Sequence, residues 1–392
     1  MTDNSEYKKA INQHVVETLQ QQFQRKYGQK ASVIEHAPGR VNLLGDHTDY
    51  NQGFVLPAAI NYGTNVAISA RTDDIISVYA LDIENDHVEF SLTDTSLDTE
   101  HSWSNYVRGT LLQLKQSFPE ICGANVVVSG NVPQGAGLSS SASFEIALLK
   151  AFTKLYRLNL SGVDAALIGQ RAENDFVGCN CGIMDQLISA MAMADHAMLL
   201  DCQDLTMRHA LIPDELTVLV INSKVKRGLV DSAYNERRAQ CEAVAQHFGK
   251  ASLRAVSLEE LDRERNAIEC ILYKRARHVI TENRRTTQMY TALNNKNFEQ
   301  ISSLMAQSHL SLKDDFNVTV PETDLLVSIV ADVIKHRGGV RMTGGGFGGC
   351  VVALVPNNLV AEVIAAIERK YFKQTGLVAE FYPCIATQGA FT

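Results

Sequence analysis

The sequence lacks several features that mark other classes of protein. It has no run of about 18 apolar residues, which excludes a membrane-spanning helix. It has no repeat with a period of about 20 to 50 residues, which excludes repeat architectures. No low-complexity linker or long block of like charge divides the chain, so any domain boundary has to be inferred from the order of its elements.

Cysteine is too sparse to build the fold. The 8 cysteines are spread from Cys122 to Cys384, and this spacing excludes a small disulfide-stapled domain. The one close pair, Cys179 and Cys181, has no second pair at zinc-finger spacing. We expect two packed thiols beside a loop rather than a metal site.

Composition and charge predict a soluble globular protein of two domains. The 392 residues are 45 % hydrophobic and 20 % charged; at roughly 100 to 200 residues per domain this predicts two domains. The formal charge of −8 provides no overall field for a nucleic-acid backbone, so an anionic ligand requires a local site. The first 28 residues have amphipathic helical spacing and no signal-peptide core, which favours a cytoplasmic protein.

The expected elements alternate between helix and strand. In the first half, strands are expected at 64–71, 75–81, 87–91 and 124–129, and helices over 144–155, over 164–177 and from about 183. In the second half, strands are expected at 216–222 and 351–355, and helices at 232–248, 268–284 and 322–336. The pattern predicts a mixed α+β fold.

The segment from Pro133 to Ser143 reads PQGAGLSSSAS and lies between an expected strand and an expected helix. Small residues allow backbone N–H groups to converge on an anion, and the start of the helix adds partial positive charge. The segment lacks the lysine of a Walker A loop and the Gly-x-Ser-x-Gly of a nucleophile elbow. It therefore predicts either a phosphate cradle of another kind or a tight strand-to-helix turn.

Three further segments carry polar or glycine-rich chemistry. Residues 37–51 bring Arg, Asp, His and Asn together around glycines, which favours recognition of a polyol over a metal site built from Asp46, His47 and Asp49. Asp185 follows the 178–182 loop in the first turn of an expected helix, where a cap is the simplest role. Residues 344–349 match Gly-x-Gly-x-x-Gly, but a strand follows them, which excludes a dinucleotide fold.

These four segments resemble the motifs of the galactokinase family of GHMP small-molecule kinases, and they follow one another along the chain in the family's order. Residues 39–50 are similar to the galactokinase signature, residues 133–143 to the GHMP phosphate loop and residues 344–349 to the third GHMP motif. The signature separates galactokinases from relatives that act on mevalonate, homoserine or phosphomevalonate. The resemblance extends from about residue 37 to 350.

The resemblance implies the two-lobed GHMP kinase fold, with the active site between the lobes. The N-terminal lobe, placed at residues 1–200, would contain a mixed sheet, and the C-terminal lobe, at 201–392, an antiparallel sheet layered on helices. The implied reaction transfers the γ-phosphoryl group of ATP to the C1 hydroxyl of α-D-galactose, the first step of galactose catabolism. It implies Mg²⁺ as cofactor, galactose and ATP as partners, no nucleic acid or membrane, and a monomer.

The resemblance also assigns roles to individual residues. Asp185 would accept the proton of the C1 hydroxyl, or act through its charge, and Arg40 would stabilise the transition state. The remaining assignments are sugar binding for Asp46, His47, Thr48, Asp49, Gly182 and Tyr234; ATP binding for Gly135, Ala136, Gly137, Leu138, Ser139, Ser140 and Ser141, with Trp103 and Tyr106 near the adenine; and Mg²⁺ binding for Ser141 and Glu173.

The sequence departs from the family pattern at two positions. Asp46 replaces the usual Glu, which predicts a modest shift in sugar affinity, and Leu44 replaces the usual Ile, which should be neutral. A 1-kinase for N-acetylgalactosamine or arabinose is an alternative. A galactose sensor without turnover is another, but it is associated with loss of the Ser-Ala pair that Ser141 and Ala142 retain.

Overall fold

The computed structural model describes residues 4–133, 137–225 and 230–392. Its helices are α1 (Asn4–Tyr27), α2 (Ser104–Ser117), α3 (Ser140–Tyr156), α4 (Gly162–Arg171), α5 (Met184–Met191), α6 (Val230–His247), α7 (Leu258–Arg263), α8 (Cys270–Asn294), α9 (Phe298–Ser311), α10 (Pro321–Ile334) and α11 (Val360–Thr375). Short helical turns are η1 (Asp49–Asn51), η2 (Ala172–Val177), η3 (Leu253–Ala255), η4 (Leu312–Phe316) and η5 (Asn357–Leu359). None of the helices within these ranges is long and apolar enough to cross a bilayer.

The strands form three sheets. They are β1 (Val33–Asn42), β2 (Phe54–Val55), β3 (Pro57–Ala70), β4 (Ile75–Ala80), β5 (Asp86–Ser91), β6 (Ala124–Gly130), β7 (His196–Asp201), β8 (Met207–Leu211), β9 (Leu216–Asn222), β10 (Gly339–Thr343), β11 (Cys350–Pro356) and β12 (Glu380–Cys384). The first sheet has the order β1-β3-β6-β4-β5 and is mixed, because β4 runs parallel to β6. The second, β10-β11-β9-β12, is antiparallel throughout, and the third is β2-β7-β8. The expected α+β fold with these two kinds of sheet is confirmed.

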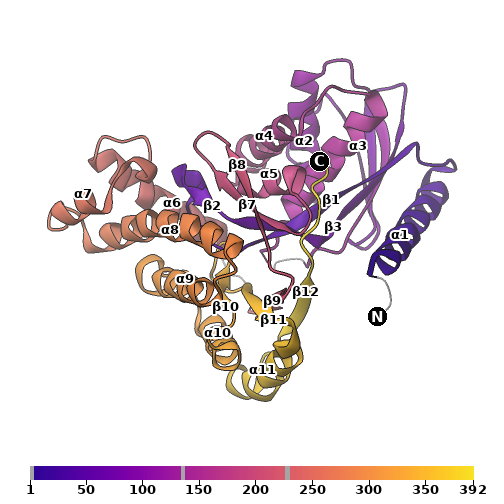
Figure 1. Cartoon of the computed structure of the whole chain (residues 1–392). Coiled ribbons are helices and arrows are strands. Elements are labelled where there is room, and N and C mark those ends of the chain that lie inside the picture. Colours follow the sequence, from indigo (N-terminus) through magenta and orange to yellow (C-terminus); the bar gives the residue numbers. More distant parts are fainter. Residues whose placement is uncertain (1–3, 134–136, 226–229) are drawn as a thin grey trace.

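The first sheet has helices on both faces because its strands alternate. Val66, Ile68 and Val126 point into a core with α2 and α3, whereas Ala67 and Val127 point to the opposite face and contact α1. Figure 1 shows α1 apart from α2 and α3, across this sheet. Both faces of the sheet are therefore covered.

The second sheet joins the two halves of the chain. One face of β9 and β11 packs on α10 and α11, through residues such as Ile221 and Val351. The other face, including Val220 and Val352, shares a core with α8, α9 and Val41 of β1. This shared core packs β1 against the second sheet, and Thr343 of β10 donates its hydroxyl to the carbonyl of Asn42 at the end of β1.

The last residues return to the first half of the chain. Ala386 pairs with Ile60 of β3, and the amides of Gly389 and Phe391 donate to carbonyls of Ala192 and Ala190. Figure 1 shows the C-terminus beside α5. The division at residue 200 stays a prediction.

Candidate active site

Arg40 lies on a strand, not on the loop that its glycine and proline neighbours suggest. The register of β1 against β3 shifts between Pro38 and Arg40, and such a bulge accommodates Pro38 and Gly39 within a strand. The Arg40 amide donates to the Leu138 carbonyl at 3.1 Å. A Cβ on Gly39 would lie 2.8 Å from the same carbonyl oxygen. The bulge therefore brings β1 against the glycine- and serine-rich loop.

Arg40 and Asp185 form a two-pronged ion pair. Arg40 Nε and Nη2 each lie 2.8 Å from one oxygen of the Asp185 carboxylate, and Nη1 donates to the Gly137 carbonyl at 2.6 Å. Asp185 is in the first turn of α5, and Ser139 Oγ also donates to it. The Arg40 side chain is 7 % exposed and that of Asp185 is 28 % exposed. The carboxylate is thus oriented by the arginine while one side stays open to the cavity.

The serines beside Asp185 stand at the start of α3. Ser139 adopts a left-handed conformation, with φ 59°, and the helix begins at Ser140. The unpaired N–H groups of a first helical turn attract anions. Of the predicted phosphate loop, Gly135 and Ala136 lie outside the described residues, whereas Gly137, Leu138, Ser139, Ser140 and Ser141 line the cavity.

Glu173 is carried by a π-helical turn, a local widening frequent at functional sites. The helix expected over 164–177 is therefore α4 continued by this turn. Burial raises the pKa of the Glu173 carboxyl, and bonds from Ser141 and Cys181 oppose the shift. Glu145 is 1 % exposed, its pKa is raised well above the usual value by burial and the charge of Glu173, and its Oε1 has no partner among the described residues.

The buried carboxyl groups of Glu173 and Glu145 are better explained by a bound divalent cation than by a site without one. Among the described residues, no set of three or more His, Cys, Asp or Glu is arranged to hold a metal. Mg²⁺ in phosphoryl-transfer sites usually takes only one or two protein ligands, together with phosphate oxygens and water. Glu173 and the Ser141 hydroxyl match that donor set.

The sugar-signature loop, residues 43–48 between β1 and η1, turns sharply. Gly45 and His47 have positive φ values of 94° and 65°. Thr48 does not line the cavity, because its hydroxyl is fully buried and donates to the carbonyls of Gly45 and Phe54 at 2.7 Å. The Thr48 side chain thus supports the loop, and its predicted role in sugar binding stays a prediction.

Asp49 lines the cavity beside Gly182. A Cβ on Gly182 would lie 2.1 Å from Asp49 Oδ2, so only glycine leaves room for this carboxylate. Burial, and then the charge of Asp185, raise the pKa of Asp49 to about 6. The side chain can therefore change its charge near neutral pH.

His47 is held neutral among aromatic rings. Burial, and then His278, lower its pKa to about 3, and its Nδ1 lies 2.9 Å from the Tyr50 hydroxyl. Its ring centroid lies 5.3 Å from that of Tyr234 and 4.7 Å from that of Phe316. Tyr234 lines the cavity as predicted. Tyr50 lies within the signature segment but no role was predicted for it, and Phe316 carries no motif signal.

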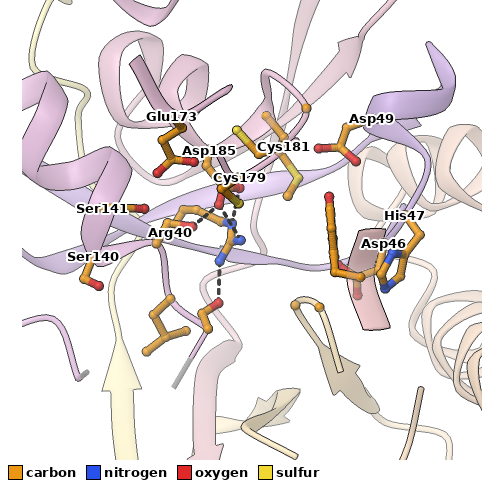
Figure 2. A pocket seen from close by; sticks show the side chains of 18 of the residues that line it. Arg40, Asp46, His47, Asp49, Ser140, Ser141, Glu173, Cys179, Cys181 and Asp185 are labelled. Carbon is orange, nitrogen blue, oxygen red and sulfur yellow. Dashed lines mark hydrogen bonds and ion pairs between the residues drawn. The ribbon is translucent and has the colours of Figure 1, made fainter. Parts of the chain in front are cut away.

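These side chains surround one cavity of about 280 Å³. Figure 2 shows Ser141 and Glu173 at one end, Asp46, His47 and Asp49 at the other, and Arg40 with Asp185 between them. Among the lining residues that the structure describes, Arg40 is the only cation. Cys179 and Cys181 also line it, and neither is in a disulfide.

A second cavity, of about 300 Å³, adjoins the first. It shares Ser140 and Ser141 with the first cavity, and Trp103, Tyr106 and Phe144 form part of its wall. Trp103 donates its indole N–H to Asp86 at 2.8 Å, which fixes the ring. The predicted aromatic pair therefore lies on the far side of the helix start from Asp185.

Comparisons with known proteins match both the fold and the loops. Residues 21–70 match the galactokinase galactose-binding signature, 105–193 the GHMP kinase N-terminal domain and 289–374 the GHMP kinase C-terminal domain. The galactokinase of Lactococcus lactis, solved with galactose, is 34 % identical over 96 % of this chain and 99 % of its own, with a TM-score of 0.90.

More distant structures share the fold alone. The mevalonate kinase of Methanococcus jannaschii is 18 % identical over 91 % of this chain and 98 % of its own, with a TM-score of 0.62. The phosphomevalonate kinase of Streptococcus pneumoniae is 12 % identical over 89 % and 100 %, with a TM-score of 0.63.

Fold and site together define an ATP-dependent small-molecule kinase of the GHMP type. Within that class, the chain belongs to the galactokinase family.

Proposed function

We propose that this chain transfers the γ-phosphoryl group of ATP to the C1 hydroxyl of α-D-galactose, giving galactose 1-phosphate and ADP. The observation that carries the proposal is the Arg40–Asp185 pair, held between a helix start suited to phosphate and a loop of acidic hydrogen-bond acceptors. The arrangement of these groups along the two cavities supports binding of a nucleotide whose base occupies the second cavity and whose phosphates extend over Ser140 and Ser141.

Phosphoryl transfer depends mainly on positioning and charge neutralisation. Asp185 accepts the proton of the attacking hydroxyl or stabilises it through charge, and Arg40 fixes the carboxylate with two parallel bonds. Among the described residues that line the cavity, Arg40 is the cation that can neutralise negative charge developing at the transfer point. Glu173 and Ser141 would hold Mg²⁺, which supplies charge neutralisation on the phosphates when bound.

Sugar recognition follows from the other end of the cavity. Asp46 and Asp49 offer carboxylate oxygens to hydroxyl donors, and neutral His47 stands beside them. A site built to hydrogen-bond a hydroxyl leaves its polar groups unpaired when an analogue lacks that hydroxyl. Such a site can discriminate against the analogue by a factor of roughly 10⁴ to 10⁵ in kcat/KM. We expect strong selection against glucose on this basis.

The test is ADP release with Mg²⁺ and ATP across galactose, 2-deoxygalactose, N-acetylgalactosamine, arabinose, glucose and mevalonate. Turnover with galactose and little with glucose supports the proposal. If N-acetylgalactosamine or arabinose is turned over faster than galactose, that sugar and not galactose is the substrate. Galactose binding by calorimetry without turnover of any sugar would instead identify a sensor.

A further inference from the structure

The Asp46 carboxylate is held by an arginine that lies far away in the sequence. Arg341, on β10, forms an ion pair with Asp46 Oδ2, and the two side chains are 0 % and 3 % exposed. Asp46 Oδ1 accepts a bond from Asn42 Nδ2 at 2.8 Å. On the backbone side, His278 Nε2 of α8 lies 3.2 Å from the Asp46 carbonyl oxygen. Three separate elements thus hold this one residue.

The same guanidinium also anchors the start of the sugar-signature loop. Arg341 Nη1 donates to the Leu43 carbonyl at 2.9 Å, while Nη2 meets Asp46. Thr343, two residues further along β10, donates its hydroxyl to the Asn42 carbonyl at 2.8 Å. A planar fork can make both of the Arg341 contacts at once, whereas the single ammonium of lysine cannot reproduce that geometry.

A gain in the stability of the fold does not by itself explain why Arg341 and Asp46 are paired. Desolvation of two buried charges offsets much of their attraction, so a buried ion pair often contributes little net stability. Asp46, however, lines a cavity that already contains Asp49 and Asp185, and the cation in that cavity, Arg40, is bonded to Asp185. Arg341 places a positive charge against the Asp46 carboxylate and so compensates its negative charge.

We propose that Arg341 is a positioning residue for sugar recognition: it fixes the Asp46 carboxylate so that its free lone pairs accept a bond from a sugar hydroxyl. The inference rests on the proposed function, because it names how that site reads its sugar. The arginine touches neither substrate nor reacting atoms. Its effect passes through Asp46 and the loop that carries Asp46, so it should act on sugar affinity and leave nucleotide affinity unchanged.

The experiment measures galactose affinity by calorimetry with Mg²⁺ and a non-hydrolysable ATP analogue, in the wild type, Arg341→Lys, Arg341→Met and Asp46→Asn. We expect the galactose Kd to rise about 10- to 100-fold in Arg341→Met and Asp46→Asn, the range of one charged hydrogen bond, and several-fold in Arg341→Lys. The Kd of the ATP analogue should change less than about twofold. The double variant Arg341→Met/Asp46→Asn should bind galactose no more weakly than the poorer single variant, because both act on one contact.

Thr343→Val is the matched control, since it removes a neighbouring bond from β10 to the same loop but leaves the Asp46 partner in place. Its galactose Kd should stay near wild type. An equal loss in Thr343→Val and Arg341→Lys would show that docking of the loop, not the carboxylate, matters, and would overturn the proposal. If Arg341→Met does not fold, the proposal is tested with Arg341→Lys and with the double variant Arg341→Met/Asp46→Asn, which lacks both charges. A wild-type galactose Kd in folded Arg341→Lys overturns the proposal.

A panel of monodeoxy galactoses identifies the hydroxyl concerned. The deoxy sugar that lacks the Asp46 partner should bind the wild type weakly, and both Asp46→Asn and Arg341→Met should erase that penalty for the same sugar. Erasure by Asp46→Asn alone would contradict the role of Arg341. Failure of the wild type to bind any galactose would instead contradict the proposed function, so the two failures are distinguishable.

Discussion

Replacement of Asp185 by asparagine tests the centre of the site. The substitution keeps the size of the side chain but removes its charge and its ability to take a proton. Loss of a general base costs roughly 10² to 10⁴ in rate, which is about 3 to 5 kcal/mol at about 1.36 kcal/mol per decade. We therefore expect kcat to fall by that factor, with a much smaller change in the galactose KM.

The same substitution should lower stability only modestly. Arg40 would keep its bond to the Gly137 carbonyl, and the asparagine oxygen could still accept one of the two N–H groups. Breaking a fully buried pair costs about 3 to 5 kcal/mol, but Asp185 is 28 % exposed, so we expect about 1 to 2 kcal/mol. Over 392 residues that loss corresponds to a drop in Tm of about 1 to 3 °C.

A surface pair of similar geometry provides the control. Arg71 contacts both oxygens of Asp73, at 2.8 and 2.7 Å, and Asp73 is 46 % exposed. Neither residue lines either cavity. Asp73→Asn should leave kcat at the wild-type value and barely change thermal stability, because exposed ion pairs contribute little.

Steady-state kinetics and thermal unfolding decide the outcome. Arg40→Met and Asp185→Asn should combine non-additively, because the two side chains act as a unit. A kcat within about threefold of wild type in a folded Asp185→Asn protein would refute the assigned role. A collapse of Tm together with kcat in Asp185→Asn would show instead that the pair is structural.

Three residues of the cavity wall carry the remaining predictions. Because the pKa of Asp49 is about 6, its carboxylate is protonated at pH 5. Galactose should therefore bind about tenfold more weakly at pH 5 than at pH 8. Calorimetry should show that Asp49→Asn removes this pH dependence. The raised pKa also means that Asp49 lowers stability as pH rises from about 4 to 6, so sugar-free Asp49→Asn should melt above the wild type at pH 7; a lower Tm there would contradict the shift. Gly182→Ala should raise the galactose Kd at least about tenfold while the ATP Kd stays constant, since its Cβ would displace Asp49, and equal losses would indicate misfolding. Glu173→Gln should weaken Mn²⁺ binding in the nucleotide complex, measured by electron paramagnetic resonance, and unchanged Mn²⁺ binding would remove Glu173 from the metal site.

Local sequence patterns predicted those parts of the fold whose cause is local. The expected strand at 124–129 is observed as β6, and the strand expected at 351–355 lies within β11. The expected helix at 322–336 is α10. Helices α2, α9 and α11 were not predicted, although each has apolar residues on one face. The π-helical turn at Glu173 also escaped prediction, because its hydrophobic spacing does not differ visibly from that of a continuous helix.

By itself, the sequence determined the chemistry available to the protein. It showed a loop able to hold phosphate, a segment rich in acceptors for hydroxyls, an aspartate at a helix start and a glycine-rich third motif, and their order carried the family resemblance. These features depend on residue type and short spacing, which a sequence displays directly.

Only the tertiary structure decided which of these groups act together. Arg40 meets Asp185 across 145 positions of the chain, and Arg341 reaches the Leu43 carbonyl across 298. Thr48, inside the signature, turns away from the cavity, whereas Arg341, outside it, holds Asp46. Contacts of this kind arise from a bulged strand and a core shared by both halves of the chain, and neither leaves a periodic or local trace in the sequence.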